Sequence, residues 1–130
     1  MAVTISSVLA AQIVADANAN PETEICGLLV GRAGHVDEIL PATNVADDPA
    51  RRFEVDPSAL FAALRRERNG EGTVIGHYHS HPSGDATPSA TDSAMIRHPG
   101  EIWLIAARGE LSAWRANGEN SFDRVALILA

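Results

Sequence analysis

The amino-acid pattern predicts a fold of the α/β or α+β class. Amphipathic helix patterns alternate with short apolar runs that suit strands, and three further strand-like runs, separated by glycine-containing turns, complete the chain. The sequence has 130 residues without repeats or low-complexity linkers, so we expect a single domain over residues 1–130. A chain of this length can bury roughly two thirds of its unfolded surface without disulfides.

The first third of the chain is expected to hold a helix followed by a hairpin. Residues 8–19 form an alanine-rich amphipathic pattern that Ser6 or Ser7 can cap. Residues 25–31 are a continuous apolar run suited to a central strand, and a turn leads into a second strand at 35–40. These two strands are therefore predicted to pair.

Helices and strands alternate along the rest of the chain. After a short strand at 53–55, Asp56 and Pro57 supply the N-cap and first position of a helix that ends at Asn69-Gly70. A strand at 73–81 and a helix from Pro88 to about Arg97 follow. The last three strands are expected at 101–107, 111–116 and 122–129, joined by hairpin turns.

Charge and composition narrow the possible partners. The formal net charge is −7, and all ten basic residues are arginines with no extended basic stripe, so nucleic acid is not an expected partner. No run approaches the roughly 20 apolar residues of a membrane span. The single cysteine, Cys26, fits a reducing compartment. We expect a soluble, cytoplasmic protein that does not bind membranes.

The stretch from Gly76 to Met95 carries the most informative side chains. His79 and His81 are two residues apart, so an extended strand places both imidazoles on one face with Cβ atoms about 7 Å apart. Pro82 then ends the strand, and Asp92 follows on the expected helix. Zinc takes histidine nitrogens and carboxylate oxygens, and a catalytic zinc keeps three protein ligands. We predict that His79, His81 and Asp92 bind one zinc ion.

Ser89 and Asp92 also match a helix capping box, in which a serine caps the helix and an acid follows three residues later. Pro88 favours a different arrangement, because proline prefers the first helical position and would make Thr87 the N-cap. Ser89 and Asp92 would then share one helix face without a capping role. We expect this second arrangement.

Two other side chains could enter the ligand set. His77 shares the strand face with the other two histidines, and a three-histidine site would leave Asp92 as an orienting acid. At strand rise, however, His77 lies about 13 Å from His81, which is too long a span for one ion. Asp85 could replace Asp92, although a helix would hold Asp92 more rigidly than a loop holds Asp85.

The complete pattern resembles the JAMM metalloprotease motif of the MPN domain family. The matching residues are His79-Ser80-His81-Pro82, the seven residues from Pro82 to Pro88, and Ser89-Ala90-Thr91-Asp92. Upstream, the family carries its catalytic glutamate shortly before a strand rich in glycine and leucine. Here Glu24 stands before Gly27-Leu28-Leu29, whereas the nearby Glu22 has the wrong spacing to Gly27 for the family pattern.

This resemblance implies a fold and a division of labour. The fold would be α/β, with a mixed central sheet flanked by helices, of the MPN or cytidine-deaminase-like type. One zinc ion per chain would serve hydrolysis, with Glu24 as general base and acid. Ser89 would donate a hydrogen bond to the oxyanion of the tetrahedral intermediate.

The resemblance also implies a substrate class. The scissile bond would be an amide or isopeptide bond at the C-terminal tail of a ubiquitin-like or sulfur-carrier protein, as in compact prokaryotic relatives. The loop from Pro41 to Phe53, with its two adjacent arginines, is expected to form part of the surface that recognises this tail. The alternative function is a non-catalytic MPN scaffold that mediates assembly with other proteins.

Three further side chains receive structural assignments. Cys26 lies inside an apolar strand, where a small buried thiol is a more common finding than a nucleophile. Trp103 and Trp114 lie in expected strands and are assigned to the core.

Overall fold

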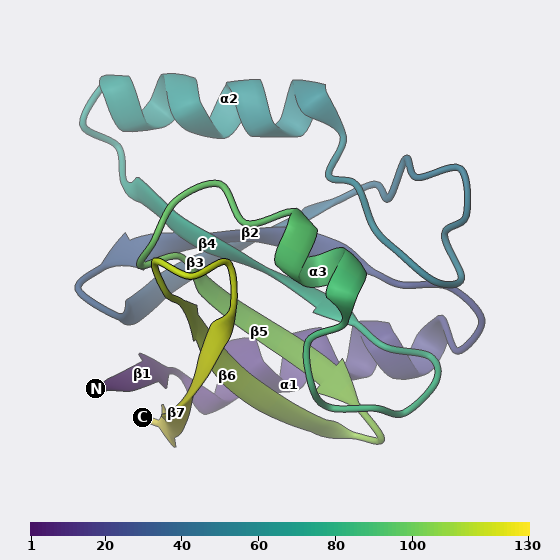
Figure 1. Ribbon diagram of the computed structural model, residues 1–130. Coiled ribbons are helices and arrows are strands. Elements are labelled where there is room, and N and C mark those ends of the chain that lie inside the picture. Colours follow the sequence, from purple (N-terminus) through teal and green to yellow (C-terminus); the bar gives the residue numbers. More distant parts are fainter.

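Seven strands and three helices make up the chain, and the computed structural model describes all 130 residues (Figure 1). The strands are β1 (Ala2–Ile5), β2 (Cys26–Arg32), β3 (His35–Ala42), β4 (Thr73–Ser80), β5 (Ile102–Ala107), β6 (Glu110–Ala116) and β7 (Phe122–Leu129). The helices are α1 (Ser7–Ala19), α2 (Pro57–Arg68) and α3 (Ala90–Ala94). This combination of one sheet and flanking helices agrees with the predicted class.

The sheet is mixed and closes on itself. The strand order is β1-β3-β2-β4-β5-β6-β7, and β1 is parallel to both β3 and β7. Strands β4 and β5 are also parallel, whereas the other neighbouring pairs are antiparallel. Closure through β1 gives hydrogen-bond partners to backbone groups that edge strands would otherwise leave unpaired.

Strand β1 is the one element that the sequence pattern did not predict. Its register pairs Ala2 with Ala126 and Ile5 with Leu129. Val3 and Ile5 have no exposed surface, because they point into the core between β3 and β7. A run of four residues is too short for its periodicity to identify a strand.

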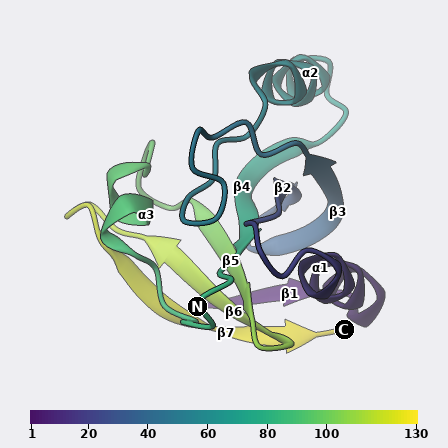
Figure 2. The ribbon, with the colours of Figure 1, turned by 90° about the vertical axis from the view of Figure 1, so that its right-hand side faces the viewer.

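Helix α1 packs against β5 and β6 over the larger of two apolar clusters. Ser6 caps the helix, as predicted, because its hydroxyl accepts a hydrogen bond from the Leu9 amide at 3.1 Å. Ile13 of α1 and Tyr78 of β4 are both buried in this cluster. Figures 1 and 2 show α1 and α2 on opposite sides of the sheet.

Helix α2 follows its prediction, whereas the segment before it does not. Asp56 caps the helix through the Ser58 amide, and Pro57 occupies the first helical position. The predicted strand at 53–55 is only an isolated bridge between Asn44 and Val55. None of the three helices has the length and apolar character needed to cross a bilayer.

Helix α3 is shorter than predicted, and its N-cap is Ser89 rather than Thr87. The expectation of a helix starting at Pro88 is therefore wrong. The reason is that Thr87 is bonded to the preceding turn. The carboxylate of Asp85 accepts hydrogen bonds from the Thr87 amide at 2.9 Å and from the Thr87 hydroxyl at 2.7 Å. Thr87 thus completes the preceding turn, and the helix begins after Ser89.

A second, smaller apolar cluster lies on the other side of the sheet. Its buried members are Cys26, Phe53, Trp103, Ile105 and Trp114. The assignment of the cysteine and the two tryptophans to the core is confirmed, since they are 1%, 0% and 8% exposed. The rings of His77 and His79 on β4 pack against this cluster.

Candidate metal centre

Three segments meet at the end of β4. His79 lies on β4, and His81 follows one residue after the strand ends. The antiparallel register of β2 and β4 places Cys26 opposite His79, which brings Glu24 beside the same end of the sheet. Helix α3 adds Asp92 from its first turn. The three predicted ligands and Glu24 therefore lie together.

The three predicted ligands converge on one point. The Nε2 atoms of His79 and His81 are 2.9 Å apart, and Oδ2 of Asp92 lies 3.3 Å from the first and 3.1 Å from the second. All three residues are buried, at 0%, 9% and 2% exposure. Ligand atoms about 2.0–2.1 Å from a tetrahedral zinc would stand about 3.3 Å from one another. The donor types and their separations fit such an ion.

Glu24 completes a group that is compatible with metal binding. One carboxylate oxygen of Glu24 and one nitrogen from each of His79 and His81 all lie within 4.8 Å of one another. Glu24 is 4% exposed, and its Oε1 atom is buried without a hydrogen-bond partner. Glu22, the alternative at this end of β2, is exposed. This oxygen is therefore free of intrachain hydrogen bonds and available to an atom from outside the chain.

The ring of His81 is oriented by a main-chain oxygen. Its Nδ1 atom donates a hydrogen bond to the Asp85 carbonyl at 2.7 Å, which leaves Nε2 free to act as a ligand. The side chain of Asp85 is exposed and bonds Thr87, so it does not lie in the ligand cluster. Sequence reasoning missed the carbonyl, because any residue supplies one.

The ring of His79 is held by packing. Phe53 stacks on it with ring centres 4.3 Å apart and an interplanar angle of 21°. Trp103 meets the same ring edge-on at 5.5 Å. These two buried aromatic side chains fix the ring plane of His79, a contribution that the sequence pattern did not indicate.

Ser89 and Asp92 form a capping box in the structure, and Asp92 also lies in the ligand cluster. The Ser89 hydroxyl accepts from the Asp92 amide at 3.0 Å, and Oδ2 of Asp92 accepts from the Ser89 amide at 2.8 Å. The expectation that these residues have no capping role is wrong. The same Oδ2 faces His79 and His81, so the cap fixes the carboxylate in the cluster. The hydroxyl of Ser89 accepts in this cap and keeps its own proton for donation.

Burial and neighbouring charges shift the pKa values of the two acids in the cluster in opposite directions. Burial raises the pKa of Glu24 to about 7, a shift that nearby His81 partly opposes. Burial also disfavours the charged form of Asp92, but the neighbouring ring nitrogens of His79 and His81 outweigh this and hold its pKa well below the usual range. Burial lowers the pKa of His79. Asp92 is thus ionised and Glu24 can exchange a proton near neutral pH.

His77 lies outside the cluster, as the strand spacing predicted. Its ring packs edge-on against Trp103 at 4.3 Å and against Phe53 at 5.7 Å. Its Nε2 atom lies 4.0 Å from Oε2 of Glu101, which is itself buried. Burial lowers the pKa of His77 to about 3, so the ring is neutral at physiological pH.

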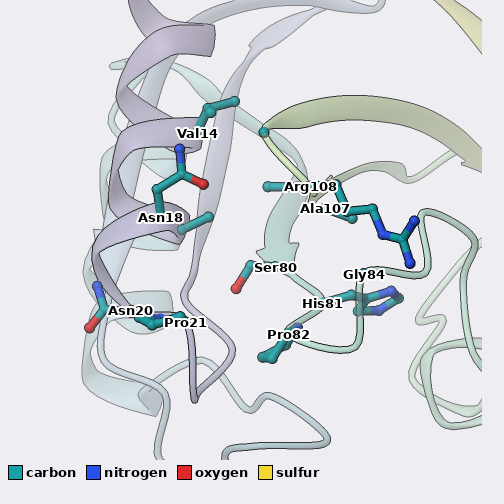
Figure 3. Close-up of a pocket in the computed structure, with 13 residues that line it drawn as sticks. Val14, Asn18, Asn20, Pro21, Ser80, His81, Pro82, Gly84, Ala107 and Arg108 are labelled. Atoms are coloured by element: carbon teal, nitrogen blue, oxygen red, sulfur yellow. The ribbon is translucent and has the colours of Figure 1, made fainter.

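Two cavities adjoin the cluster. The first, of about 240 Å³, opens above Glu24, His81 and Ser89, and its rim includes Ala50 and Arg51. The second, of about 220 Å³, lies on the other side of His81 and Pro82. Figure 3 shows this second cavity, with Val14 and Asn18 of α1 on one side and Arg108 on the other. The first cavity is the one that gives access to the unpartnered Glu24 carboxylate.

Comparison with known sequences gives consistent matches. Residues 6–117 match the family described as prokaryotic homologs of the JAB domain. The chain is 35% identical over 103 residues to a desampylase of Haloferax volcanii, covering 77% of this chain and 74% of that protein. It is 42% identical over 72 residues to a probable TtuB-protein conjugate cleaving protease of Thermus thermophilus, covering 55% and 47%. A CysO-cysteine peptidase of Mycobacterium tuberculosis is 26% identical over 110 residues, covering 79% and 75%.

Comparison with solved structures identifies the same fold. A protein of Desulfitobacterium hafniense superposes with a TM-score of 0.82 and 28% identity, covering 100% of this chain and 93% of that one. A JAB1/MPN domain protein of Archaeoglobus fulgidus superposes with a TM-score of 0.60 and 19% identity, covering 97% and 96%. The mixed sheet with flanking helices is therefore the architecture of these proteins, which confirms the predicted fold class.

Proposed function

The chain belongs to the family of prokaryotic homologs of the JAB domain, and we propose that it is a zinc-dependent isopeptidase or peptidase. Its substrate would be an amide or isopeptide bond that joins the C-terminal tail of a ubiquitin-like or sulfur-carrier protein to an amine. Relatives named as a desampylase, a TtuB-conjugate protease and a CysO-cysteine peptidase support this substrate class. The observation that carries the proposal is the buried cluster of two histidines and two acids beside an accessible cavity.

His79, His81 and Asp92 are proposed as the zinc ligands. Their three donor atoms lie 2.9–3.3 Å from one another. The ligand atoms of Glu24, His79 and His81 form a wider group, within 4.8 Å of one another, so Asp92 is the third ligand that we propose. Zinc bound there supplies an acidified water and a Lewis acid for the scissile carbonyl. Asp92 contributes the negative charge that a dication requires, and its low pKa keeps that charge at working pH.

Glu24 is proposed as the general base and acid. Its buried Oε1 atom has no partner within the chain, so it can accept a proton from the attacking water. As the carbon–nitrogen bond breaks, the same atom returns this proton to the leaving amine. A pKa near 7 suits both transfers, because the group must be able to hold and release a proton at neutral pH.

Ser89 is proposed to stabilise the oxyanion of the tetrahedral intermediate. It lines the same cavity as Glu24 and His81, and its hydroxyl proton is not used by the cap. A donor held in place before the reaction stabilises developing charge without reorganisation. The cap of α3 therefore contributes to the orientation of this donor.

The tail of the substrate is proposed to enter along the segment between β3 and α2. Ala50 and Arg51 of this segment line the cavity above Glu24, which supports the predicted role of the loop. An extended tail can add main-chain hydrogen bonds to such a rim.

We expect the protein to act in the cytoplasm, since its one cysteine is free.

Metal content and inhibition test this function together. We expect purified protein to hold one zinc per chain, and to cleave a ubiquitin-like protein joined through its C-terminal glycine to a reporter lysine. Chelation should abolish cleavage and added zinc should restore it. Thiol alkylation should have no effect, because burial raises the pKa of Cys26 to about 12. Cleavage that survives chelation, or zinc-loaded protein that cleaves no such conjugate, would overturn the proposal.

A further inference from the structure

We propose that Asn44, which lies outside the ligand cluster, is a positioning residue for the carboxylate of Glu24. Asn44 belongs to the segment of residues 43–56 that connects β3 to α2, called the 43–56 loop below. This inference rests on the proposed function, because it assigns Asn44 a task in proton transfer by Glu24. Four hydrogen bonds of one side chain carry it.

The amide of Asn44 uses its full hydrogen-bonding capacity. Its Nδ2 atom donates to the carbonyl of Glu24 at 2.9 Å and to that of Arg52 at 3.1 Å. Its Oδ1 atom accepts from the amides of Ala46 at 3.0 Å and Glu54 at 3.1 Å. A carboxamide has two donor and two acceptor positions, and here each has one partner of the correct kind. Aspartate would lose both donors, so the site is specific for asparagine.

Glu24 depends on these main-chain contacts for its position. It precedes β2, so its amide and carbonyl lie outside the β2 ladder. The amide donates to the Pro49 carbonyl at 2.7 Å, and the carbonyl accepts from Asn44. Both partners belong to the 43–56 loop. Since Oε1 of Glu24 has no partner, no hydrogen bond to that oxygen can replace the main-chain anchor.

The next residue connects this anchor to the strand that carries the histidines. The Ile25 amide donates to the Ser80 hydroxyl at 2.9 Å, and the Ser80 amide donates to the Ile25 carbonyl at 3.1 Å. Glu24 is thus fixed by the 43–56 loop on one side, and through Ile25 by β4 on the other. The loop also places Phe53 against the ring of His79. Asn44 joins both ends of the loop to Glu24.

Loss of the anchor should lower turnover while leaving the metal in place. In Asn44→Ala, Glu24 can shift relative to His79 and His81, and a displacement of about 1 Å can cost on the order of a hundredfold in rate. Asn44 does not touch the ligands, so zinc should remain at one per chain. We expect kcat to fall by roughly ten- to a hundredfold, with KM changed by less than about threefold.

Asn117→Ala is the matched control. Asn117 also organises a turn, since its Oδ1 accepts from the amides of Glu119 and Ser121, but it lies in the β6–β7 connection away from Glu24. Its loss should lower the melting temperature without changing kcat. Equal kcat values for the two variants, at equal zinc content, would overturn the role of Asn44.

Amide hydrogen exchange gives a second readout that does not need activity. In Asn44→Ala we expect the Glu24 amide to exchange at least tenfold faster than in the wild type, while the Leu29 amide in the middle of β2 keeps its protection. Unchanged exchange at Glu24 would contradict the proposal even if the wild type cleaves its substrate. A wild-type protein without hydrolysis would contradict the proposed function instead. Amide hydrogen exchange at Glu24 would then still decide whether Asn44 fixes this residue.

Discussion

At the scale of residues, Asp92 performs two tasks with one oxygen. Its Oδ2 atom accepts from the Ser89 amide at the start of α3 and faces the Nε2 atoms of both histidines. The cap therefore fixes the carboxylate before any ion binds, and such preorganisation lowers the cost of assembling the site. Because the helix cap and the ligand cluster share the side chain of Asp92, a substitution of Asp92 should weaken both.

Substitution of Ser89 should separate its effects on stability and rate. Ser89→Ala removes the cap acceptor and the proposed oxyanion donor, so we expect a loss of about 1 kcal/mol in unfolding free energy and of on the order of a hundredfold in kcat. Ser6→Ala removes the equivalent cap of α1, far from the site, and should match only the stability loss. Denaturant titration and kinetics on both variants provide the measurement. A normal kcat in Ser89→Ala would exclude the donor role.

Sequence reasoning located these side chains better than the groups that orient them. The histidines and Asp92 have a spacing that can be recognised in one dimension. The Asp85 carbonyl and the amide of Asn44 act through chain folding, and nothing in their residue types marks them beforehand. The capping prediction is wrong because the hydrogen bonds that Thr87 donates to Asp85 outweigh the preference of Pro88 for the first helical position.

At the scale of elements, the loop of residues 82–86, which is part of the connection from β4 to α3, orients His81. It turns tightly, since the Gly84 amide donates to the His81 carbonyl at 2.9 Å. Ser112 of β6 donates to the Ala86 carbonyl at 2.8 Å and holds the far end of the loop. The position of the Asp85 carbonyl, and thus the ring orientation of His81, depends on this turn.

Gly84→Ala should weaken zinc binding through this loop. Gly84 has a φ of +84°, a conformation that strains alanine, and an added Cβ would also lie 2.5 Å from Nε of Arg108, a flexible side chain that can move aside. We expect roughly a tenfold lower zinc affinity, because the Asp85 carbonyl would shift away from His81. Gly70→Ala is a control with a similar φ of +76° and open space around the added atom. Competition with a chelator should show weaker binding in the first variant only; equal affinities would contradict this account of the loop.

The elements themselves differ in how far the sequence could predict them. Helix α2 was predicted well, because its start and end carry strong local signals in Asp56-Pro57 and Asn69-Gly70. Strand β1 was missed, because what makes it a strand is its pairing with β3, about 30 residues away, and with β7 near the C-terminus. Long-range pairing of this kind leaves little trace in four residues.

At the scale of the whole molecule, the closed sheet packs two apolar clusters, and the site lies beside the smaller one. The larger cluster lies under α1, and the smaller one contains Phe53 and Trp103 beside the histidines. His77 lies within this apolar surrounding, neutral and packed on Trp103. A histidine buried in its neutral form couples global stability to pH.

Stability should fall on acidification, and His77 should account for part of the fall. Its pKa is about 3 in the folded chain and 6.5 in the reference state, so the unfolded chain binds more protons between these values. The stability contribution is present above pH 6.5 and is lost as pH decreases toward 3. We expect His77 to contribute a loss of about 2 kcal/mol between pH 7 and pH 5.

Urea unfolding of metal-free protein at these two pH values provides the measurement. His77→Gln should have a shallower pH dependence than the wild type, whatever its absolute stability. Asn117→Ala, which removes no titratable group, serves as the control and should keep the wild-type dependence. An unchanged dependence in His77→Gln would show that the neutral ring is not responsible.

The proposed mechanism assigns the proton transfer to Glu24 and the binding of the metal to His79, His81 and Asp92. The most direct test measures zinc content and hydrolysis on the same sample of Glu24→Gln, with Glu22→Gln as the exposed neighbour for comparison. We predict one zinc per chain in both variants, with hydrolysis reduced at least about a hundredfold in Glu24→Gln alone. Retained hydrolysis in Glu24→Gln, or loss of its zinc, would contradict the assignment.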